Sequence, residues 1–266
     1  MNLEKLSYWI GLAQADGYFK KQKISKNGKS CTKYSLVLSQ REDKENIVIK
    51  FRDIFNELFQ RNNNCICTYK NMKIVNLSVT SLLKFFESND IIFSDPPRPP
   101  KWIKSNKYLF GAYLGGVIDG DGDIRISRKE YPYCAIRITS GEKQEELINS
   151  IKENFCCNVN SRKLSRTSQI DNRKIIGNYS ILEFYISSKN KRLIQKYLLP
   201  HISVKYKKEA IEQFLKKRKY KKKPAKTWGK SFQCAYQNIF SHKSVITSLK
   251  LSLYSNYNNF TISRNR

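Results

Sequence analysis

Histidine is scarce in this chain: His201 and His242 are the only two among 266 residues. This scarcity argues against a nuclease that uses a histidine general base on a ββα metal finger. The seven cysteines include no Cys-x-x-Cys pair, so the usual spacing of a zinc site is absent. The N-terminal MNLEKLSYW lacks the basic-then-apolar pattern of a signal peptide, and an odd cysteine count then indicates reduced thiols in a reducing compartment.

Acidic residues are also few, with 22 Asp and Glu against 50 Lys and Arg, which gives a formal net charge of +28. Such a surplus predicts a polyanionic partner, most simply nucleic acid, with an anionic membrane surface or a ribosomal structural role as alternatives. No apolar run approaches the roughly 18 residues of a membrane-spanning helix, so no membrane insertion is expected. Apolar residues make up 40% of the chain, which is enough for a packed core.

Three segments of the first half recur in the same order in the second half. Residues 9–20 align with 114–125, residues 39–55 with 139–155, and residues 77–81 with 184–188. The offset changes from 105 to 100 to 107, as expected if loops changed length between two copies of one unit.

Each copy predicts the order α-β-β-α-β-β-α, and the fold class is therefore α+β. The expected helices are 5–16 and 43–60 in the first copy and 107–121 and 143–155 in the second, each copy ending in a further helix. The expected strands are 18–26, 33–40, 64–70 and 73–79, then 123–128, 133–139, 157–165 and 179–187.

Proline marks the boundary between the copies, because four of the seven prolines lie in DPPRPPK at 95–101. We therefore expect a first repeat at 1–94, an extended linker at 95–106 and a second repeat at 107–215. Residues 216–266 form a basic C-terminal extension: KKRKYKKKPAK at 216–226 reads as a solvated segment that touches phosphates, and 227–266 has no predicted role.

Asp119, Asp121 and Asp123 follow an apolar run, and three interpretations compete for them. The spacing of acids in DGDGDIRISRKE (119–130) fits a Ca²⁺ loop, but Ile124 occupies the position that needs glycine. A polar turn between helix and strand is the second interpretation, and a metal site is the third. In the first copy Asp16 matches Asp121, whereas Gln14 and Tyr18 replace Asp119 and Asp123.

The repeat favours a metal site at Asp16 and Asp121. Each carboxylate falls in the last turn of its helix, where the helix dipole disfavours negative charge and a cation would relieve the penalty. Small residues four apart, Gly11 and Ala15 in one helix and Gly116 and Gly120 in the other, let the helices approach closely. Two converging carboxylates suit metal-assisted hydrolysis of a phosphodiester. Asp119 and Asp123 are expected to be polar residues without a catalytic role.

WIGLAQADG (9–17) and LGGVIDGDG (114–122) resemble the paired signature of the LAGLIDADG homing endonucleases in their single-chain, two-motif form. The second copy is the closer match, while the first departs at Trp9, Ala13 and Gln14. The resemblance covers about residues 1–215. It implies two αββαββα halves related by a pseudo-two-fold axis, with the motif helices at the centre and the antiparallel sheets forming a saddle over DNA.

The resemblance also implies the site residues. Asp16 and Asp121 would bind catalytic Mg²⁺ or Mn²⁺ with the carbonyls of Ala15 and Gly120, and Ca²⁺ is expected to bind without supporting cleavage. Gln40 would orient solvent, with Ser140 at the matching position of the second copy. The family uses a basic residue near the metals, which nominates Lys205 and, in the first copy, Lys101.

Strand alternation under this fold predicts which side chains face DNA, with Ile124 and Ile126 packing inward. The predicted DNA contacts are Tyr18, Lys20, Gln22, Lys33, Ser35, Lys70, Lys73, Asp123, Arg125, Ser127, Arg137, Arg162 and Arg173. Because the two copies differ at these positions, the target should be long and asymmetric double-stranded DNA, and one chain needs no dimer.

The leading functional hypothesis is a Mg²⁺-dependent, intron-encoded, site-specific DNA endonuclease that acts as a monomer. The alternative is an RNA-binding intron maturase of the same fold, with intron RNA as its partner. A third interpretation, a DNA-binding regulator without catalysis, is disfavoured by the intact Asp16 and Asp121. The Lys-, Asn-, Ile- and Tyr-rich composition is typical of an AT-rich genome, so we expect an organelle-encoded protein of a mitochondrion or chloroplast.

Overall fold

The computed structural model describes residues 1–26, 29–93, 96–127, 132–170 and 173–217. Met1–Arg218 form one compact unit. Almost all of the predicted C-terminal extension lies outside the described residues. No helix in the described part of the chain is long and apolar enough to cross a membrane.

The first half contains α1 (Leu3–Asp16), β1 (Gly17–Lys26), β2 (Lys29–Arg41), α2 (Glu45–Phe59), β3 (Ile66–Tyr69), β4 (Met72–Ser78) and α3 (Leu83–Ser88). A 3₁₀ turn, η1 (Glu42–Lys44), joins β2 to α2, and a second, η2 (Thr80–Leu82), precedes α3. The strands form an antiparallel sheet in the order β1-β2-β4-β3.

The second half repeats this plan with α5 (Lys107–Asp121), β5 (Gly122–Ser127), β6 (Tyr133–Ser140), α6 (Glu145–Phe155), β7 (Val159–Ile170) and β8 (Arg173–Tyr185). Its sheet has the equivalent order β5-β6-β8-β7. The half closes with α7 (Lys191–Leu193), η3 (Ile194–Leu198), η4 (Leu199–His201) and α8 (Lys205–Lys217). The predicted α+β class and the repeated order are confirmed, although β7 and β8 pair over a longer hairpin than expected.

The proline-rich segment contains a helical turn, α4 (Lys101–Lys104), where an extended linker was expected. The backbone N–H groups of Ile103 and Lys104 both donate to the Pro100 carbonyl at 3.0 Å. Prolines are tolerated at this place because they precede the turn, where no N–H is needed. Burial of Ile103 then anchors the turn to the core.

Trp9, which departs from the usual motif letters, fills the space between α1 and α2. Its ring stacks on Phe51 with centroids 5.1 Å apart, and its indole N–H donates to the Phe51 carbonyl at 3.1 Å. Phe55 and Phe86 also pack against the indole. Buried aromatic pairs of this kind stabilise a core beyond the area they bury, so Trp9 has a packing role.

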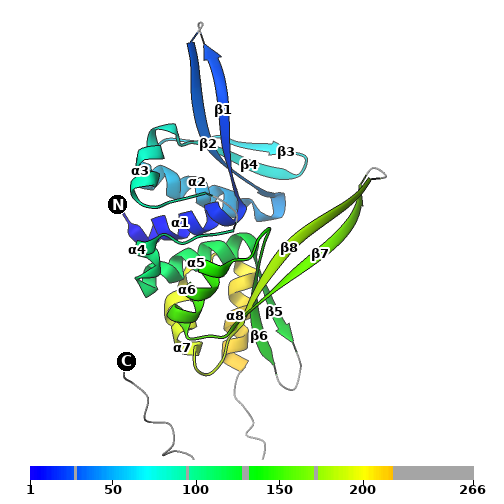
Figure 1. The fold of residues 1–266 in the computed structure, drawn as a ribbon. Helices are drawn as coiled ribbons and strands as arrows, with labels where there is room; N and C mark the ends of the chain where they lie inside the picture. Colours follow the sequence, from blue (N-terminus) through cyan, green and yellow to red (C-terminus); the bar gives the residue numbers. More distant parts are fainter. Residues whose placement is uncertain (27–28, 94–95, 128–131, 171–172, 218–266) are drawn as a thin grey trace, which may run out of the picture. The chain divides into compact units, whose positions relative to one another are not determined.

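The two motif helices, α1 and α5, lie side by side at the junction of the halves (Figure 1). A β-carbon on Gly11 would overlap the Tyr113 carbonyl, with the carbonyl carbon at 2.9 Å. The equivalent β-carbon on Gly116 would overlap the Tyr8 carbonyl and lie 2.8 Å from the Leu12 nitrogen. The glycines therefore permit backbone-to-backbone contact, and the predicted helix pair is confirmed.

Candidate metal and nucleic-acid site

Asp16 ends α1 and meets the end of α5. The Gln40 side-chain amide donates to Asp16 Oδ2, so the structure brings this predicted pair together. A β-carbon on Gly120 would lie 3.1 Å from the same oxygen and 2.8 Å from the Ala15 β-carbon. Burial raises the pKa of the Asp16 carboxyl to about 6, opposed in part by the charges of Lys207 and Lys44.

Lys207 is the cation that lies close to both motif carboxylates. The charges of Asp16 and Asp121 each favour its ammonium form, as does the larger effect of Asp119, while burial lowers its pKa to about 8. Gly120, the residue before Asp121, lies against Ala15 and Asp16, so the two helix ends lie together. The predicted convergence of Asp16 and Asp121 at one end of the helix pair is therefore consistent with the structure.

The Lys207 side chain is only 1% exposed and caps α5. Its Nζ donates to the main-chain carbonyls of Ile118 at 2.6 Å and Asp119 at 2.9 Å, and the Gly120 carbonyl lies at 3.5 Å. The Ile118 carbonyl also accepts the backbone N–H of Gly122, the residue that ends α5. The carbonyls of a last helical turn can take further donors, and a cation also complements the negative end of the helix dipole. Lys207 therefore stabilises the helix end that presents Asp121.

Lys205 and Lys101, the basic residues nominated from the sequence, do not occupy this place. The Lys205 side chain is 86% exposed and lies 4.0 Å from the Glu209 carboxylate one turn further along α8. Lys101 begins α4 and is exposed. Lys207 and Lys44 are instead the two cations whose charges act on Asp16.

A signal for Lys207 existed in the sequence. Lys207, Ile211 and Phe214 follow helical spacing, and all three are buried, so this lysine belongs to the apolar stripe of α8. Lys205 does not belong to that stripe. Lys44 lies at the end of a 3₁₀ turn, where no periodicity could have selected it.

The donors at this site suit a hard divalent cation. The carboxylates of Asp16 and Asp121 and the carbonyls of Ala15 and Gly120 are all oxygen ligands, the type that Mg²⁺, Mn²⁺ and Ca²⁺ take. Asp16 is half-buried, yet it makes no ion pair within 4 Å among the described residues, so a cation would offset its desolvation. In the part of the chain that the structure describes, no group of three or more His, Cys, Asp or Glu side chains is placed to hold a metal ion.

The two halves of the site are unequal. Ser140, the counterpart of Gln40, donates through Oγ to the Glu142 carbonyl at 2.6 Å. Gln144, the counterpart of Lys44, is buried and donates to the Ile138 carbonyl at 3.3 Å. The positions equivalent to Gln40 and Lys44 in the second half therefore hold side chains that bond to main-chain carbonyls, and Lys207 of α8 is a cation on which the charge of Asp121 acts.

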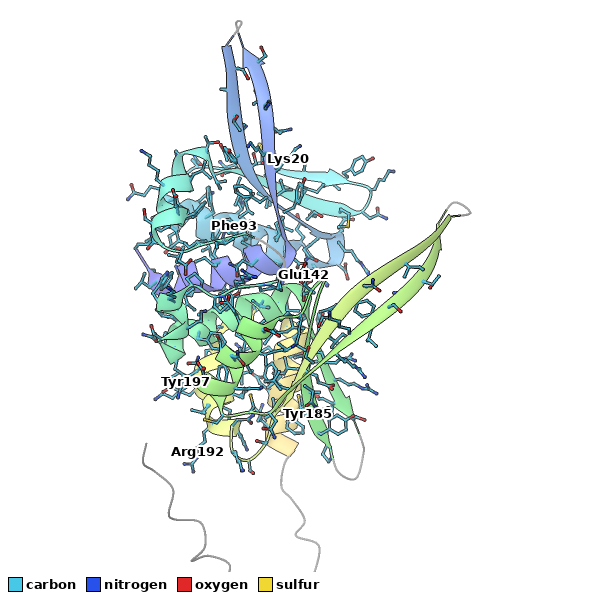
Figure 2. The ribbon with its side chains drawn as sticks, in the orientation of Figure 1. Lys20, Phe93, Glu142, Tyr185, Arg192 and Tyr197 are labelled. Atoms are coloured by element: carbon cyan, nitrogen blue, oxygen red, sulfur yellow. The ribbon has the colours of Figure 1, made fainter. Side chains whose placement is uncertain are left out.

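The first sheet presents most of its predicted contacts on the face away from the helices. Tyr18 pairs with Val37, Lys20 with Ser35 and Gln22 with Lys33, so these side chains share one face. Figure 2 labels Lys20 on this hairpin. Ser35 is a correction: it is only 1% exposed, because it lies between Lys20 and Ser78 in the register, and a covered hydroxyl is not available to a partner.

Lys70 and Lys73, two predicted DNA contacts near the second hairpin of this sheet, differ in their surroundings. Lys70 lies in the β3–β4 turn with φ of 45°, and its exposed ammonium lies 5.4 Å from the centre of the Tyr69 ring. Lys73 is a correction: it pairs with Gln40, which places it on the helix-facing side of the sheet. Its Nζ lies 3.5 Å from the carboxylates of Glu42 and Glu45, so this charge is already paired.

The second sheet keeps its predicted residues on the outer face, although two of them pair with each other. Asp123 and Arg137 are opposite in the register and form an ion pair. Arg125 and Arg162 are exposed, and Ser127 is half-buried at the end of β5. Arg173 begins β8, but its side chain lies outside the described residues. Ile124 packs on the core as predicted, whereas Ile126 is exposed near the end of the strand.

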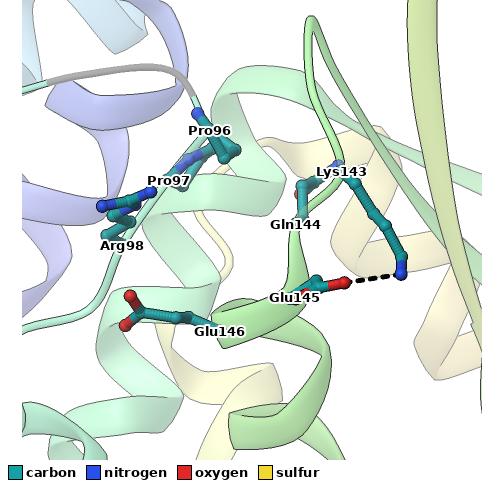
Figure 3. Close-up of a pocket in the computed structure, with 7 residues that line it drawn as sticks. All are labelled: Pro96, Pro97, Arg98, Lys143, Gln144, Glu145 and Glu146. Carbon is teal, nitrogen blue, oxygen red and sulfur yellow. Dashed lines mark hydrogen bonds and ion pairs between the residues drawn. The ribbon is translucent and has the colours of Figure 1, made fainter.

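A cavity of about 210 Å³ lies between the proline-rich segment and the start of α6 (Figure 3). Pro96, Pro97, Arg98 and residues 143–146 line it, and the Lys143 ammonium pairs with Glu145 at 2.6 Å. Neither motif carboxylate lines this cavity, so it is distinct from the candidate metal site.

Comparison with known proteins identifies the fold. No protein-family model matches the sequence, and no curated protein sequence matches it. The structure of I-DmoI in complex with DNA and Ca is similar, with a TM-score of 0.50 and 17% identity over 80% of this chain and 100% of that chain. The I-LtrWI LAGLIDADG homing endonuclease bound to target DNA gives a TM-score of 0.49 and 16% identity over 81% of this chain and 91% of that chain. The chain therefore has the LAGLIDADG homing endonuclease fold, and the predicted resemblance is confirmed at that level.

Proposed function

We propose that this chain is a site-specific DNA endonuclease that hydrolyses phosphodiester bonds with divalent metal ions at a long, asymmetric target. The observation that carries the proposal is the arrangement of Asp16 and Asp121 at the ends of two glycine-packed helices, both within the electrostatic reach of Lys207. A fold that only binds DNA has no need for two carboxylates at this junction, because they repel phosphate.

Each residue of the site has a part in the proposed reaction. Asp16 and Asp121, with the Ala15 and Gly120 carbonyls, would hold Mg²⁺ or Mn²⁺. The bound ion supplies charge stabilisation to the reacting phosphate and the departing oxygen. Gln40 fixes the orientation of Asp16 through its amide N–H, which leaves its Oε1 to accept a hydrogen bond from a water molecule. Lys44 and Lys207 balance the local negative charge.

The outer faces of the two sheets would contact the DNA. Lysine, arginine, glutamine and tyrosine side chains lie there, and the two faces differ in sequence: Tyr18 and Lys20 of β1 correspond to Asp123 and Arg125 of β5. Unlike half-sites would then be recognised by one chain acting as a monomer. Basic side chains position the backbone, while arginine and glutamine can read base edges in the major groove.

The maturase alternative gains no support from the similar structures, which are bound to DNA. The proposal that the gene lies in an AT-rich organellar genome, within an intron, rests on composition and on the resemblance.

Selection from a library of randomised duplexes tests the proposed activity directly. The protein is incubated with the library and Mg²⁺, and cut ends are sequenced, with Asp16→Asn protein as the matched control. We expect one enriched, non-palindromic sequence that is cut by the wild-type protein and is left intact by the variant. Absence of enrichment, or equal cutting by both proteins, would contradict the proposal.

A further inference from the structure

We infer that Asp119 is a positioning residue: its buried side chain holds the start of α8 so that Lys207 lies at the end of α5, beside Asp16 and Asp121. This inference rests on the proposed function, since its consequence is for cleavage. The sequence alone predicts Asp119 to be a polar residue without a catalytic role, and the inference adds a positioning role.

The Asp119 carboxylate is completely buried and has three hydrogen-bond donors. Oδ2 accepts from the Tyr8 hydroxyl at 2.7 Å and from the Ser203 backbone N–H at 2.8 Å, and Oδ1 accepts from the Val204 N–H at 3.1 Å. Val204 carries the carbonyl that receives the Lys208 N–H, so the carboxylate holds the two residues that immediately precede α8. A carboxylate at a helix start satisfies free N–H groups and complements the dipole.

The same residue contacts α8 a second time, one turn further along. The main-chain carbonyl of Asp119 accepts from Lys207 Nζ at 2.9 Å. Lys207 follows Val204 by three residues, so the clamp on Val204 and the lysine contact are separated by about one turn of helix. A shift of the helix start would therefore move the ammonium relative to the three carbonyls that hold it.

Comparison with the first repeat shows why this position carries a charge. Gln14 occupies the equivalent place, where its Oε1 accepts from the Tyr113 hydroxyl at 2.6 Å and from the Arg98 N–H at 3.0 Å. Its amide nitrogen donates to the carbonyls of Ile92 and Arg98, which a carboxylate could not do. The Tyr8–Asp119 and Tyr113–Gln14 contacts are thus related by the repeat.

The segment held by Gln14 carries no buried lysine. The counterpart of Lys207, 105 positions earlier, is Trp102, whose indole N–H donates to the Asn89 carbonyl at 3.0 Å. The neutral amide of Gln14 is therefore sufficient to hold that segment. Beside Asp119, two lysines need a counter-charge: Lys207, and Lys50, whose Nζ donates to Ser203 Oγ and lies 3.8 Å from the centre of the Tyr8 ring. An unpaired buried charge is costly, so the carboxylate belongs with the lysines.

Asp119→Asn is the informative variant, because asparagine has nearly the same shape but only one acceptor oxygen. That oxygen can serve Tyr8 and Ser203, and the amide group then faces the Val204 N–H, donor against donor. Tyr113→Phe is the matched control, since it removes one buried hydrogen bond at the same helix interface without touching α8. Two readouts are needed: hydrogen exchange in the protein without DNA or metal, and the single-turnover cleavage rate beside the affinity for DNA.

In Asp119→Asn protein we expect exchange at the amides of residues 203–208 to rise by at least about tenfold. The cleavage rate at saturating DNA should fall about 100-fold while DNA affinity is retained, as expected when a group is misplaced by roughly 1 Å. The double variant with Asp119→Asn and Lys207→Met should cleave almost as fast as Lys207→Met alone, because both substitutions act on the placement of Lys207. Tyr113→Phe should change neither readout.

Unchanged hydrogen exchange at residues 203–208 in Asp119→Asn protein would overturn the inference, as would cleavage by this variant at the wild-type rate. Losses of cleavage rate that multiply when Asp119→Asn and Lys207→Met are combined would also overturn it. If Asp119→Asn does not fold, Tyr8→Phe takes its place with the same readouts, because it removes one of the three donors. If the wild-type protein cleaves no duplex, the proposed function fails, and the exchange result alone decides whether Asp119 holds α8.

Discussion

Gly116 of α5 packs directly on the carbonyl of Tyr8 in α1, with no room between them for a β-carbon. The mirror contact, Gly11 on Tyr113, has the same geometry. These two contacts set the distance between the helices that carry Asp16 and Asp121, so the site depends on two residues that have no side chain.

Gly116→Ala should therefore destabilise the whole unit. The obstacle is backbone on both sides, which cannot rotate away, and we expect an overpacking cost of about 1–3 kcal/mol or more in the free energy of unfolding. Gly177→Ala is the control, because the nearest atom to its β-carbon would be the Arg166 carbonyl oxygen at 4.0 Å. Urea unfolding of both variants checks this, and equal stability would mean that the helices are not in backbone contact.

Asp16 should make stability depend on pH in the metal-free protein. Burial raises the pKa of its carboxyl to about 6 in the folded state, so ionisation opposes folding. This contribution to stability is fully present below the unfolded pKa of about 4 and is lost as pH rises through about 6.

Asp16→Asn should then be more stable than the wild type at pH 7, by on the order of 2 kcal/mol, and equal to it near pH 4. Urea titrations at the two pH values, in buffer with a chelator, measure the difference. Asp123→Asn, which alters an exposed carboxylate paired with Arg137, should show no such gain. A stability difference that is the same at both pH values would exclude Asp16 as its source.

Lys207 and Lys205 should respond very differently to replacement by methionine. Lys207→Met removes the donor to three carbonyls of α5 and one of the two cations that act on Asp16, so cleavage should fall steeply. Lys205→Met removes an exposed charge and should reduce cleavage little. Cleavage rates at saturating DNA compare the two. A larger loss of cleavage rate for Lys205→Met than for Lys207→Met would instead support Lys205 as the basic residue near the metals.

DNA binding should be strongly dependent on salt. If the outer faces of the sheets neutralise about 8 phosphates, the logarithm of the binding constant should fall against the logarithm of salt concentration with a slope near −7. Titrations in Ca²⁺ at several salt concentrations give the slope. A slope shallower than about −3 would be incompatible with an extended DNA-contacting surface.

The repeat in the sequence is sufficient to predict the order of helices and strands along the chain and the helix pair. Gln40 follows from the family resemblance, and its contact with Asp16 comes from the structure. The repeat is insufficient for Ser35 and Lys73, because alternation along a strand does not show which neighbours cover a side chain or in what register β4 pairs. The charges of Lys44 and Lys207 act on Asp16 from a 3₁₀ turn and from a helix distant in sequence, and such proximity appears only in three dimensions.

The match between the two repeats assigns Asp119 no catalytic role, because its counterpart is glutamine. Both residues accept a tyrosine hydroxyl and a backbone N–H from a distant segment, so one structural place is filled by two chemistries. A comparison of amino-acid types at these two positions suggests that the role is not shared. The hydrogen bonds show instead that glutamine and aspartate make equivalent contacts with different charge.

The central claim is that Asp16 and Asp121 act together in metal-dependent DNA cleavage, and replacing each by asparagine tests it most directly. Binding and cleavage of one selected duplex are measured for the wild type, Asp16→Asn and Asp121→Asn, with a chelator, Ca²⁺ or Mg²⁺. Both variants should bind as tightly as the wild type or more tightly, especially with the chelator, since repulsion between carboxylates and phosphate is relieved. Neither should cut both strands in Mg²⁺, and the rate should fall by several orders of magnitude. Cleavage of both strands by either variant at the wild-type rate would contradict the account.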